Sequence, residues 1–253
     1  MTTETLISCR GLSKAFGSHV VLDGLDLDVR AGETLVILGH SGSGKSVLLK
    51  HINVLLRPDA GSVSYEGHAI SDLEEGTLVE VRRRIGMLFQ GGALFDSLTV
   101  EDNVAFALDH HGMCGGSERA DRVAALLDDV GLGGTQAKMP SDLSGGMRKR
   151  AALARSLALE PEVLLYDEPT TGLDPVTGKQ INELIRDCQH RLGVTSIVVT
   201  HDLASAYFVA DRIAFLYDKV IHRVGTVEEM RASGVPVIEA FLSAGATRPP
   251  ERR

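Results

Sequence analysis

The sequence contains no tryptophan, and aromatic residues make up only 4% of it. A surface for single-stranded nucleic acid needs aromatic side chains on which the bases stack, so this class of protein is disfavoured. Basic residues are also in the minority, because 26 lysines and arginines stand against 34 aspartates and glutamates, a formal net charge of −8. Since binding of a nucleic-acid backbone requires a basic surface, we expect no nucleic-acid partner.

Cysteine and long apolar runs are scarce as well. Cys9, Cys114 and Cys188 form an odd, widely spaced set without a C-x-x-C pair, which fits neither a disulfide framework nor a zinc site. No apolar run approaches the roughly 18 residues that span a bilayer, and the first residues do not resemble a signal peptide. We therefore expect a soluble intracellular chain with reduced thiols, whose membrane work, if any, is done through a partner.

The hydrophobic pattern predicts an α/β fold. Short strands are predicted at 6–9, 20–22 and 25–29, and the alternation of apolar with polar residues in the last of them suggests an antiparallel sheet with one solvent-exposed face. Another strand is predicted at 61–67. Helical spacing follows at 100–109, 117–130 and 144–159. Strands at 163–166, 195–199 and 213–217 then alternate with helices at 176–191 and 202–209, which predicts a parallel-sheet core. A short apolar helix at 237–242 is free to pack on its own domain or on a second copy.

A glycine-rich loop lies between an apolar strand and a helix at residues 39–46, GHSGSGKS. This context makes G-x-x-x-x-G-K-[ST] a phosphate-binding loop rather than an ordinary turn. Its glycines let backbone N–H groups approach phosphate oxygens, and the helix N-terminus adds partial positive charge. We expect Lys45 to reach the β- and γ-phosphates and the Ser46 hydroxyl to bind Mg²⁺.

Polar residues end three other predicted strands. Asp167 and Glu168 follow the apolar run 163–166, where they form either a solvated acidic turn or, beside a phosphate-binding loop, a magnesium ligand and a base. Gln90 ends a predicted buried strand at 85–90 and is either an ordinary surface residue or a contact to Mg²⁺ or water. His201 is placed to contact a γ-phosphate, while Asp202 is suited to cap the following helix.

The stretch 143–147, LSGGM, has two glycines in the first turn of a predicted helix, after Ser144 as N-cap. Each glycine there costs about 1 kcal/mol relative to alanine. That cost is understandable if the phosphates of another molecule approach the exposed N–H groups. Since the chain already has a loop for its own nucleotide, this second phosphate-binding feature suggests that a nucleotide is sandwiched between two copies.

Taken in order, these motifs resemble those of the ABC ATPases from residue 6 to about residue 230. The resemblance implies a Walker A motif at 39–46, a Q-loop at Gln90, a signature at 143–147, a Walker B motif at 164–168, a D-loop at 171–174, a switch histidine at His201 and an adenine-stacking Phe16. Met147 replaces the glutamine that usually ends the signature. The implied architecture is one nucleotide-binding domain, 1–253, with a RecA-like core and antiparallel β subdomain (5–90 and 161–230), a helical subdomain (91–160) and a tail (231–253).

The resemblance also implies ATP and Mg²⁺ as cofactors and a head-to-tail homodimer. The implied ATP contacts are Phe16, Gly39, His40, Ser41, Gly42, Ser43, Gly44, Lys45, Ser46, Val47, Ser144, Gly145, Gly146, Met147 and Asp174. The implied catalytic residues are Glu168 as general base, His201, Lys45 and Gln90, and the implied magnesium ligands are Ser46, Gln90 and Asp167. Asp174 is expected to relay the state of the partner across the dimer.

Within the ABC ATPases, LSGGMRKR and the residues after Gln90 resemble the ATPases of Mla-type phospholipid transporters. This implies permease subunits, an MCE-domain lipid-binding protein, a place on the cytoplasmic face of the inner membrane, and a role in outer-membrane lipid asymmetry. The alternatives are an importer of another solute, such as an amino acid, and a non-transport ABC ATPase. The basic runs 82–84 and 148–150 are interpreted as solvated ends of elements, because no wider basic field surrounds them.

Overall fold

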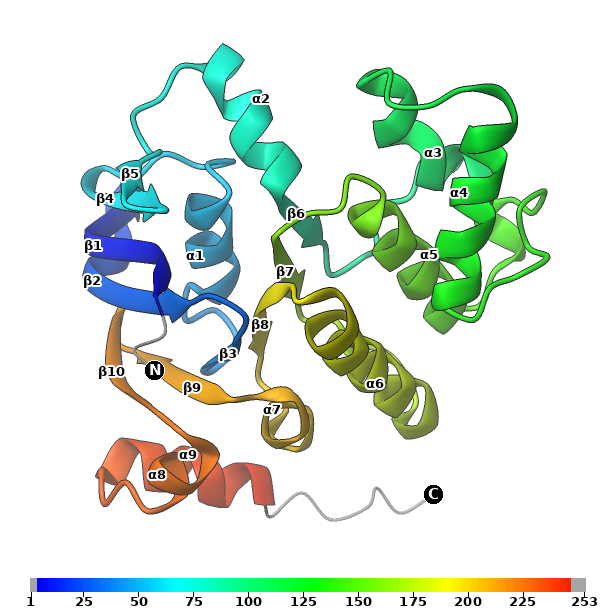
Figure 1. Cartoon of the computed structure of the whole chain (residues 1–253). Coiled ribbons are helices and arrows are strands. Elements are labelled where there is room, and N and C mark those ends of the chain that lie inside the picture. The colour runs from blue at the N-terminus through cyan, green and yellow to red at the C-terminus, as the bar shows by residue number, and fades with distance from the viewer. Residues whose placement is uncertain (1–3, 247–253) are drawn as a thin grey trace. The chain divides into compact units, whose positions relative to one another are not determined.

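A computed structural model describes residues 4–246 of the chain (Figure 1). The chain divides into two compact units. The first unit comprises Met1–Leu73 and Ile197–Arg253, and the second comprises Glu74–Ser196.

An antiparallel sheet in the first unit has the strand order β2-β1-β4-β5. Its strands are β1 (Thr5–Phe16), β2 (His19–Arg30), β4 (Ala60–Tyr65) and β5 (His68–Ala69). The side chains of Leu25, Leu27 and Val29 are buried and alternate with more exposed neighbours, as the sequence pattern predicts. The two short strands expected between residues 20 and 29 are one strand, because a bulge at Asp23 and Gly24 keeps the pairing with β1 continuous.

The other strands of the first unit lie in the order β10-β9-β3-β8. They are β10 (Val220–Gly225), β9 (Arg212–Tyr217), β3 (Thr34–Leu38) and β8 (Thr195–Thr200), of which β8 begins in the second unit. β3 and β9 are parallel, and every residue of β3 is buried. The helices are α1 (Lys45–Ile52), α7 (Leu203–Val209), α8 (Val227–Arg231) and α9 (Pro236–Ala246).

In the second unit, β6 (Ile85–Leu88) pairs in parallel with β7 (Val163–Asp167), which is buried along its whole length. The helices are α2 (Glu75–Arg84), α3 (Val100–His110), α4 (Gly116–Asp129), α5 (Gly145–Leu157) and α6 (Pro175–Leu192), with a 3₁₀ turn η1 (Pro140–Asp142) before α5. α3, α4 and α5 pack against one another. The predicted fold class, parallel strands with an antiparallel β portion and a helical segment, is confirmed.

Several elements have no counterpart in the sequence prediction. β10 follows a two-residue hairpin turn in which Asp218 and Lys219 both have positive φ, at 43° and 72°. Such a turn usually has the sequence Asn-Gly or Asp-Gly, so the sequence Asp-Lys does not predict it. α2 buries only Leu78 and therefore lacks the apolar stripe that marks a helix.

The basic run at residues 82–84 forms the last turn of α2. Its three arginines pair with carboxylates of the same unit, in the ion pairs Arg82–Glu75, Arg83–Glu80 and Arg84–Glu162. These contacts agree with the interpretation of this run as the end of an element. Across residues 4–246, no helix combines the length and apolar character needed to cross a bilayer.

Candidate active site

The phosphate-binding loop lies between the buried strand β3 and helix α1 in the first unit (Figure 1). Gly44, the residue before α1, has φ of 99°, and a Cβ there would stand 2.9 Å from Cγ1 of Val21. A Cβ on Gly39 would overlap the carbonyl oxygen of Leu216. Glycine is thus required at both positions by the fold itself, and since Gly44 is the N-cap residue of α1, the helix has no N-cap side chain.

The side chain of Lys45 folds back over this loop. Its Nζ donates hydrogen bonds of 2.9 Å to the carbonyl oxygens of Gly39 and His40, and the residue is only 5% exposed. These contacts hold the ammonium group at the loop that the sequence assigns to the phosphates. The next residue, Ser46, is half-buried in the first turn of α1.

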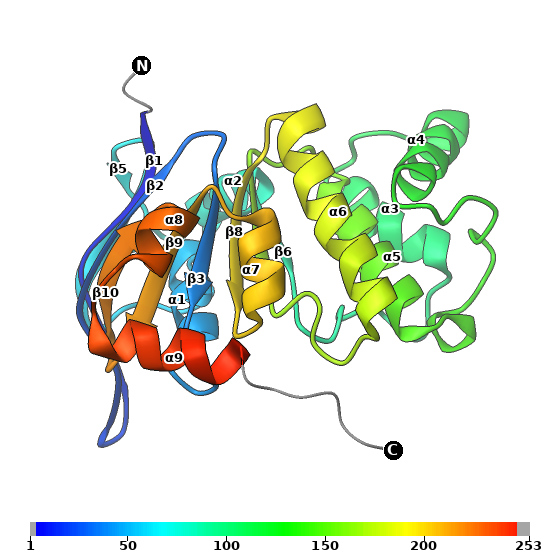
Figure 2. The ribbon, with the colours of Figure 1, turned by 90° about the horizontal axis from the view of Figure 1, so that it is seen from below.

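The C-terminal helix α9 contacts the same loop. The ring of Phe241 lies edge-on to His40, with centroids 4.8 Å apart, and also packs against Phe215 of β9. Helix α9 lies beside α8 (Figure 2). The sequence leaves this apolar helix to pack either on its own domain or on a second copy, and the structure shows it packed on its own unit. There Phe241 contacts His40, the second residue of the phosphate-binding loop.

Phe16 and His201 also belong to the first unit. Phe16 ends β1 with half of its surface exposed, and Nζ of Lys14 lies 5.7 Å from the ring centroid. The exposed ring is a suitable platform for a flat base. His201 is exposed at the end of β8, the strand next to β3. Asp202 caps α7 by accepting hydrogen bonds from Ala204 and Ser205, as its sequence position predicts.

The two acidic residues at the end of β7 belong to the second unit, and both are buried. Asp167 ends the strand and Glu168 follows with φ of 48°, in the left-handed region. The hydroxyl of Thr171 donates a 3.0 Å hydrogen bond to Oε2 of Glu168. Their burial excludes the alternative of a solvated acidic turn. The strained backbone at Glu168 is typical of residues whose orientation the surrounding structure imposes.

Gln90 lies two residues beyond β6 and is exposed. The backbone just after it is held by Arg155 of α5, whose guanidinium donates to the carbonyl oxygens of Gly92 and Ala93 at 3.0 and 2.7 Å. Burial lowers the pKa of Arg155. This contact anchors one end of the loop that carries Gln90.

The glycines of the signature differ in their surroundings. Ser144 caps α5 as predicted, accepting a 3.3 Å hydrogen bond from the Met147 N–H. Gly145 is exposed, and a Cβ there would meet only Cδ2 of Leu173 among the described residues, at 3.6 Å. Gly146 is buried, and a Cβ there would overlap the Cγ2 methyl of Thr177 on α6. Packing inside the unit therefore explains why residue 146 is glycine, whereas no such packing explains the glycine at position 145.

We expect Gly146→Ala to destabilise the fold by about 1–3 kcal/mol, the usual cost of an extra methyl group in a filled site. Adding Thr177→Ser removes the methyl group that the new Cβ meets and keeps the hydroxyl that donates to Asp174. The double variant should therefore recover most of the loss, which urea unfolding measures. Thr177→Ser alone is the control. Wild-type stability of Gly146→Ala would contradict the packing argument.

Asp174 is the N-cap of α6. Its Oδ1 accepts hydrogen bonds from the N–H groups of Val176 and Thr177, and its Oδ2 accepts one of 2.6 Å from the Thr177 hydroxyl. The Thr177 hydroxyl, together with these N–H groups, lowers the pKa of the Asp174 carboxyl. A capping role is thus established by geometry, beside the relay role expected from the sequence.

The sequence interpretation places Lys149 in a basic run and Thr171 in the D-loop, and it predicts neither residue's contact with Glu168. Lys149 belongs to the basic run 148–150, interpreted as solvated, yet it is only 6% exposed, so that interpretation is wrong for this residue. Its ammonium group is turned inward because three backbone carbonyls of the β7–α6 segment accept hydrogen bonds from it. A lysine within a charged run gives no sequence signal for such a contact.

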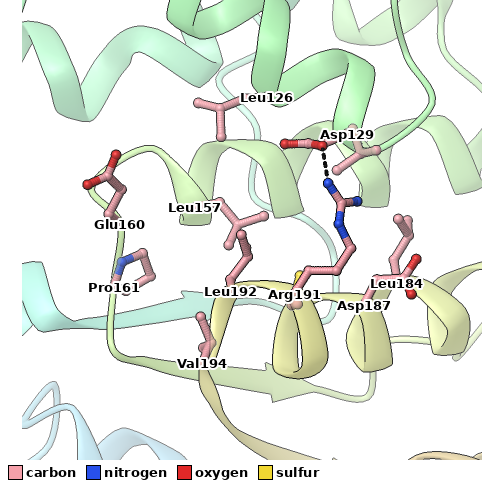
Figure 3. Close-up of a pocket in the computed structure, with 12 residues that line it drawn as sticks. Leu126, Asp129, Leu157, Glu160, Pro161, Leu184, Asp187, Arg191, Leu192 and Val194 are labelled. Atoms are coloured by element: carbon pink, nitrogen blue, oxygen red, sulfur yellow. Dashed lines mark hydrogen bonds and ion pairs between the residues drawn. The ribbon is translucent and has the colours of Figure 1, made fainter.

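A separate cavity of about 410 Å³ lies in the second unit among α4, α5 and α6 (Figure 3). Leu126, Leu157 and Leu184 contribute apolar walls, and Arg191 pairs with Asp129 at 3.2 Å on its rim. Burial raises the pKa of its Cys188 thiol to about 11, which disfavours the reactive thiolate form. None of the sequence-predicted site residues lines this cavity.

The oxygen donors expected at the metal suit Mg²⁺. A serine hydroxyl, a glutamine amide and a carboxylate are hard ligands, and Mg²⁺ commonly takes one or two protein ligands together with substrate phosphates. Within residues 4–246, no group of three or more His, Cys, Asp or Glu side chains is arranged to hold a metal alone. The donor types expected from the sequence fit Mg²⁺ that is held together with nucleotide phosphates.

Comparisons with known proteins place these motifs in context. A family model described as "ABC transporter" matches residues 22–171. The chain is 43% identical over 243 residues to the "Probable ribonucleotide transport ATP-binding protein mkl" of Mycobacterium leprae, which covers 96% of this chain and 70% of that protein. It is 39% identical over 248 residues to the "Intermembrane phospholipid transport system ATP-binding protein MlaF" of Escherichia coli K12, covering 98% and 92%.

The chain thus spans nearly all of the MlaF sequence, whereas it spans 66–70% of the length of the mycobacterial relatives. Among solved structures, one described as a "Dimeric structure of a post-hydrolysis state of the ATP-binding cassette MJ0796 bound to ADP and Pi" is 34% identical, with a TM-score of 0.81. That match covers 88% of this chain and 99% of the solved one.

Proposed function

The chain belongs to the ABC transporter family and is an ABC ATPase, and we propose that it powers a transporter that moves phospholipid between membranes of the cell envelope. The observation that carries the proposal is the similarity to MlaF along almost the full length of both chains. MlaF is named as part of an intermembrane phospholipid transport system. The predicted resemblance to ABC ATPases of this type is confirmed.

In this proposal the first unit binds the nucleotide. Phe16 stacks on adenine, while the backbone N–H groups of residues 39–47 and the N-terminus of α1 surround the phosphates. Lys45 exchanges its carbonyl contacts for oxygens of the β- and γ-phosphates, since its ammonium group already lies at the loop. His201 contacts the γ-phosphate from the end of β8.

The hydroxyl of Ser46, the side chain of Gln90 and, through water, Asp167 would hold Mg²⁺. The ion would supply positive charge that stabilises the phosphates. Glu168 accepts the proton of the attacking water as general base, and the Thr171 hydroxyl holds its carboxylate in place. Catalysis on this account comes mainly from positioning and from stabilised charge.

The second nucleotide contact comes from another copy of the chain. Ser144 and Gly145 are exposed at the start of α5, and Gly145 leaves room for a phosphate beside its N–H group. A homodimer that pairs residues 39–47 of one protomer with residues 144–147 of the other gives two equivalent sites. Asp174, which is held in place as the N-cap of α6, relays the nucleotide state of one protomer to the other in this proposal.

The permease contact is proposed at the loop after Gln90 and α3. Phe95 and Phe106 are 42% and 45% exposed, and their rings pack with centroids 4.6 Å apart. Arg155 lies 5.8 Å from the Phe95 ring and also binds the loop backbone. An exposed aromatic pair formed by an anchored loop and α3 suits a helix of a membrane subunit. The chain thereby works at the cytoplasmic face of the inner membrane, with an MCE-domain protein as the lipid-binding partner.

The second candidate function is transport of a different cargo, because the mycobacterial relatives are named for ribonucleotide transport. Affinity purification of the tagged chain from gently solubilised native membranes separates the two. Co-purification of a permease, an MCE-domain protein and phospholipid is the expected result. Recovery of a soluble solute-binding protein or a ribosome instead would reject phospholipid transport.

Phe106→Asp should abolish recovery of the permease in that experiment, since it places a charge in the aromatic pair, while ATP binding by the isolated chain is retained. Leu192→Asp is the matched control, because Leu192 is a similarly exposed apolar residue on α6 of the same unit. Equal permease recovery with both variants would contradict the proposed contact surface.

A further inference from the structure

Lys149, on the second turn of α5, holds the backbone around Glu168. Its Nζ donates hydrogen bonds to the carbonyl oxygens of Glu168, Pro169 and Thr171 at 3.2, 2.7 and 2.9 Å. An ammonium group has three protons to donate, so this one segment uses all of them. A single side chain therefore ties together the carbonyl of Glu168 and two carbonyls of the turn that follows it.

The burial of Lys149 shows that this contact is a specific one. A buried ammonium is costly unless its donors are satisfied, and here the satisfaction comes from backbone rather than from a paired carboxylate. Burial lowers the pKa of Lys149, while the nearby negative charge of Glu168 opposes that change. Because a buried lysine carries this cost, we expect Lys149 to hold a conformation that residues 168–171 do not maintain by themselves.

What needs fixing is the conformation of Glu168. Its φ of 48° lies in the left-handed region, which side-chain-bearing residues rarely adopt without support. The ammonium group of Lys149 also donates to the carbonyl oxygen of Thr171, and the hydroxyl of Thr171 donates to the Glu168 carboxylate. Lys149 thus acts on Glu168 twice, through the backbone of Glu168 itself and through the residue that holds its side chain.

We propose that Lys149 is a positioning residue for ATP hydrolysis, which holds the Glu168 carboxylate in line with the attacking water. The inference rests on the proposed role of Glu168 as general base. Lys149 itself does not touch nucleotide; it sets the geometry of the group that does the chemistry. Losing it should leave ATP binding nearly intact and slow the chemical step, because a misplaced base loses much of its effect.

A double-mutant cycle tests the proposal with the full-length chain. Lys149→Met removes the three donors and keeps a long apolar side chain. We expect it to lower kcat by about tenfold or more and to change KM for ATP less than about twofold. In a Glu168→Gln background the same substitution should change the rate less than about twofold, because the group it positions is already gone.

Each outcome of the cycle has a distinct meaning. If Lys149→Met slows the Glu168→Gln variant by the same factor as it slows the wild type, Lys149 acts independently of Glu168 and the inference is overturned. If Glu168→Gln alone keeps near wild-type turnover, the proposed role of Glu168 fails instead. Lys149→Gln, which retains two donors, provides a milder variant with an intermediate kcat should Lys149→Met fold poorly.

Arg150→Met is the matched control for general loosening of α5. Arg150 is the next residue on the same helix and donates to the carbonyls of Val130 and Gly131, away from the Glu168 segment. Its loss should leave kcat within about twofold of the wild type, even if thermal unfolding shows reduced stability. An equal fall in kcat for both variants would overturn the positioning role of Lys149.

Discussion

Replacing Glu168 with glutamine is expected to lower ATP turnover by at least about a hundredfold while ATP still binds, because general-base catalysis contributes on the order of 10²–10⁴. The amide keeps the size of the carboxylate and can still meet the Thr171 hydroxyl, which donates to Oε2 at 3.0 Å. It cannot accept a proton from water. Since Glu168 is proposed to act on the attacking water and not to bind the nucleotide, nucleotide affinity should change little.

Single-turnover hydrolysis and equilibrium binding of ATP measure the two expectations separately. Glu162→Gln is the control, because Glu162 comes just before the same strand β7 and pairs with Arg84 at the surface. It should hydrolyse ATP at the wild-type rate. Near wild-type turnover by Glu168→Gln would remove Glu168 from the role of base.

Lys45→Met is expected to weaken ATP binding by about ten- to a hundredfold, the value of one charge-assisted hydrogen bond to a phosphate. The structure explains why the loss is large. The ammonium group already sits among the loop carbonyls of Gly39 and His40, so little reorganisation is needed when phosphates arrive. Methionine fills the same buried volume without charge or donors.

Binding of a fluorescent ATP analogue to the isolated chain measures this effect. Lys50→Met is the control, because Lys50 is an exposed lysine at the other end of the same helix α1. It should bind ATP as the wild type does. Equal affinity of Lys45→Met and Lys50→Met would exclude Lys45 from phosphate binding.

The parts of the fold that sequence predicts well are those with a local physical cause. Residues 39–46 follow an apolar strand, contain glycines that the fold requires and include the start of a helix. These eight residues therefore predict both the local fold and the binding of phosphate. Ser144 and Asp202 are helix N-caps by residue type and position, and both cap as predicted. Apolar spacing likewise places α3, α4 and α6 to within a few residues.

The parts that sequence predicts poorly depend on contacts distant along the chain. Gly146 is glycine because Thr177 packs on it from another helix, and Lys149 is buried because the turn after β7 offers it three carbonyls. Neither partner can be identified from the motif that contains the residue. The contact of Phe241 with His40 is a further case, joining residues about 200 positions apart.

The central claim is that the phosphate-binding loop of one protomer is completed by the signature of another. Gly145→Glu is suited to test it, because its side chain has room and a carboxylate suits a helix N-terminus, yet it repels a γ-phosphate. A Gly145→Glu homodimer has two defective signatures, and a Lys45→Met homodimer has two defective loops. A mixed dimer contains one intact loop facing one intact signature.

The decisive measurement is the ATPase activity of mixed dimers, obtained by co-expressing the two variants with different tags and purifying on both tags in turn. We expect the mixed dimer to hydrolyse ATP clearly faster than either homodimer. Activity no higher than that of the two homodimers would contradict it, since each chain would then have to complete its own site.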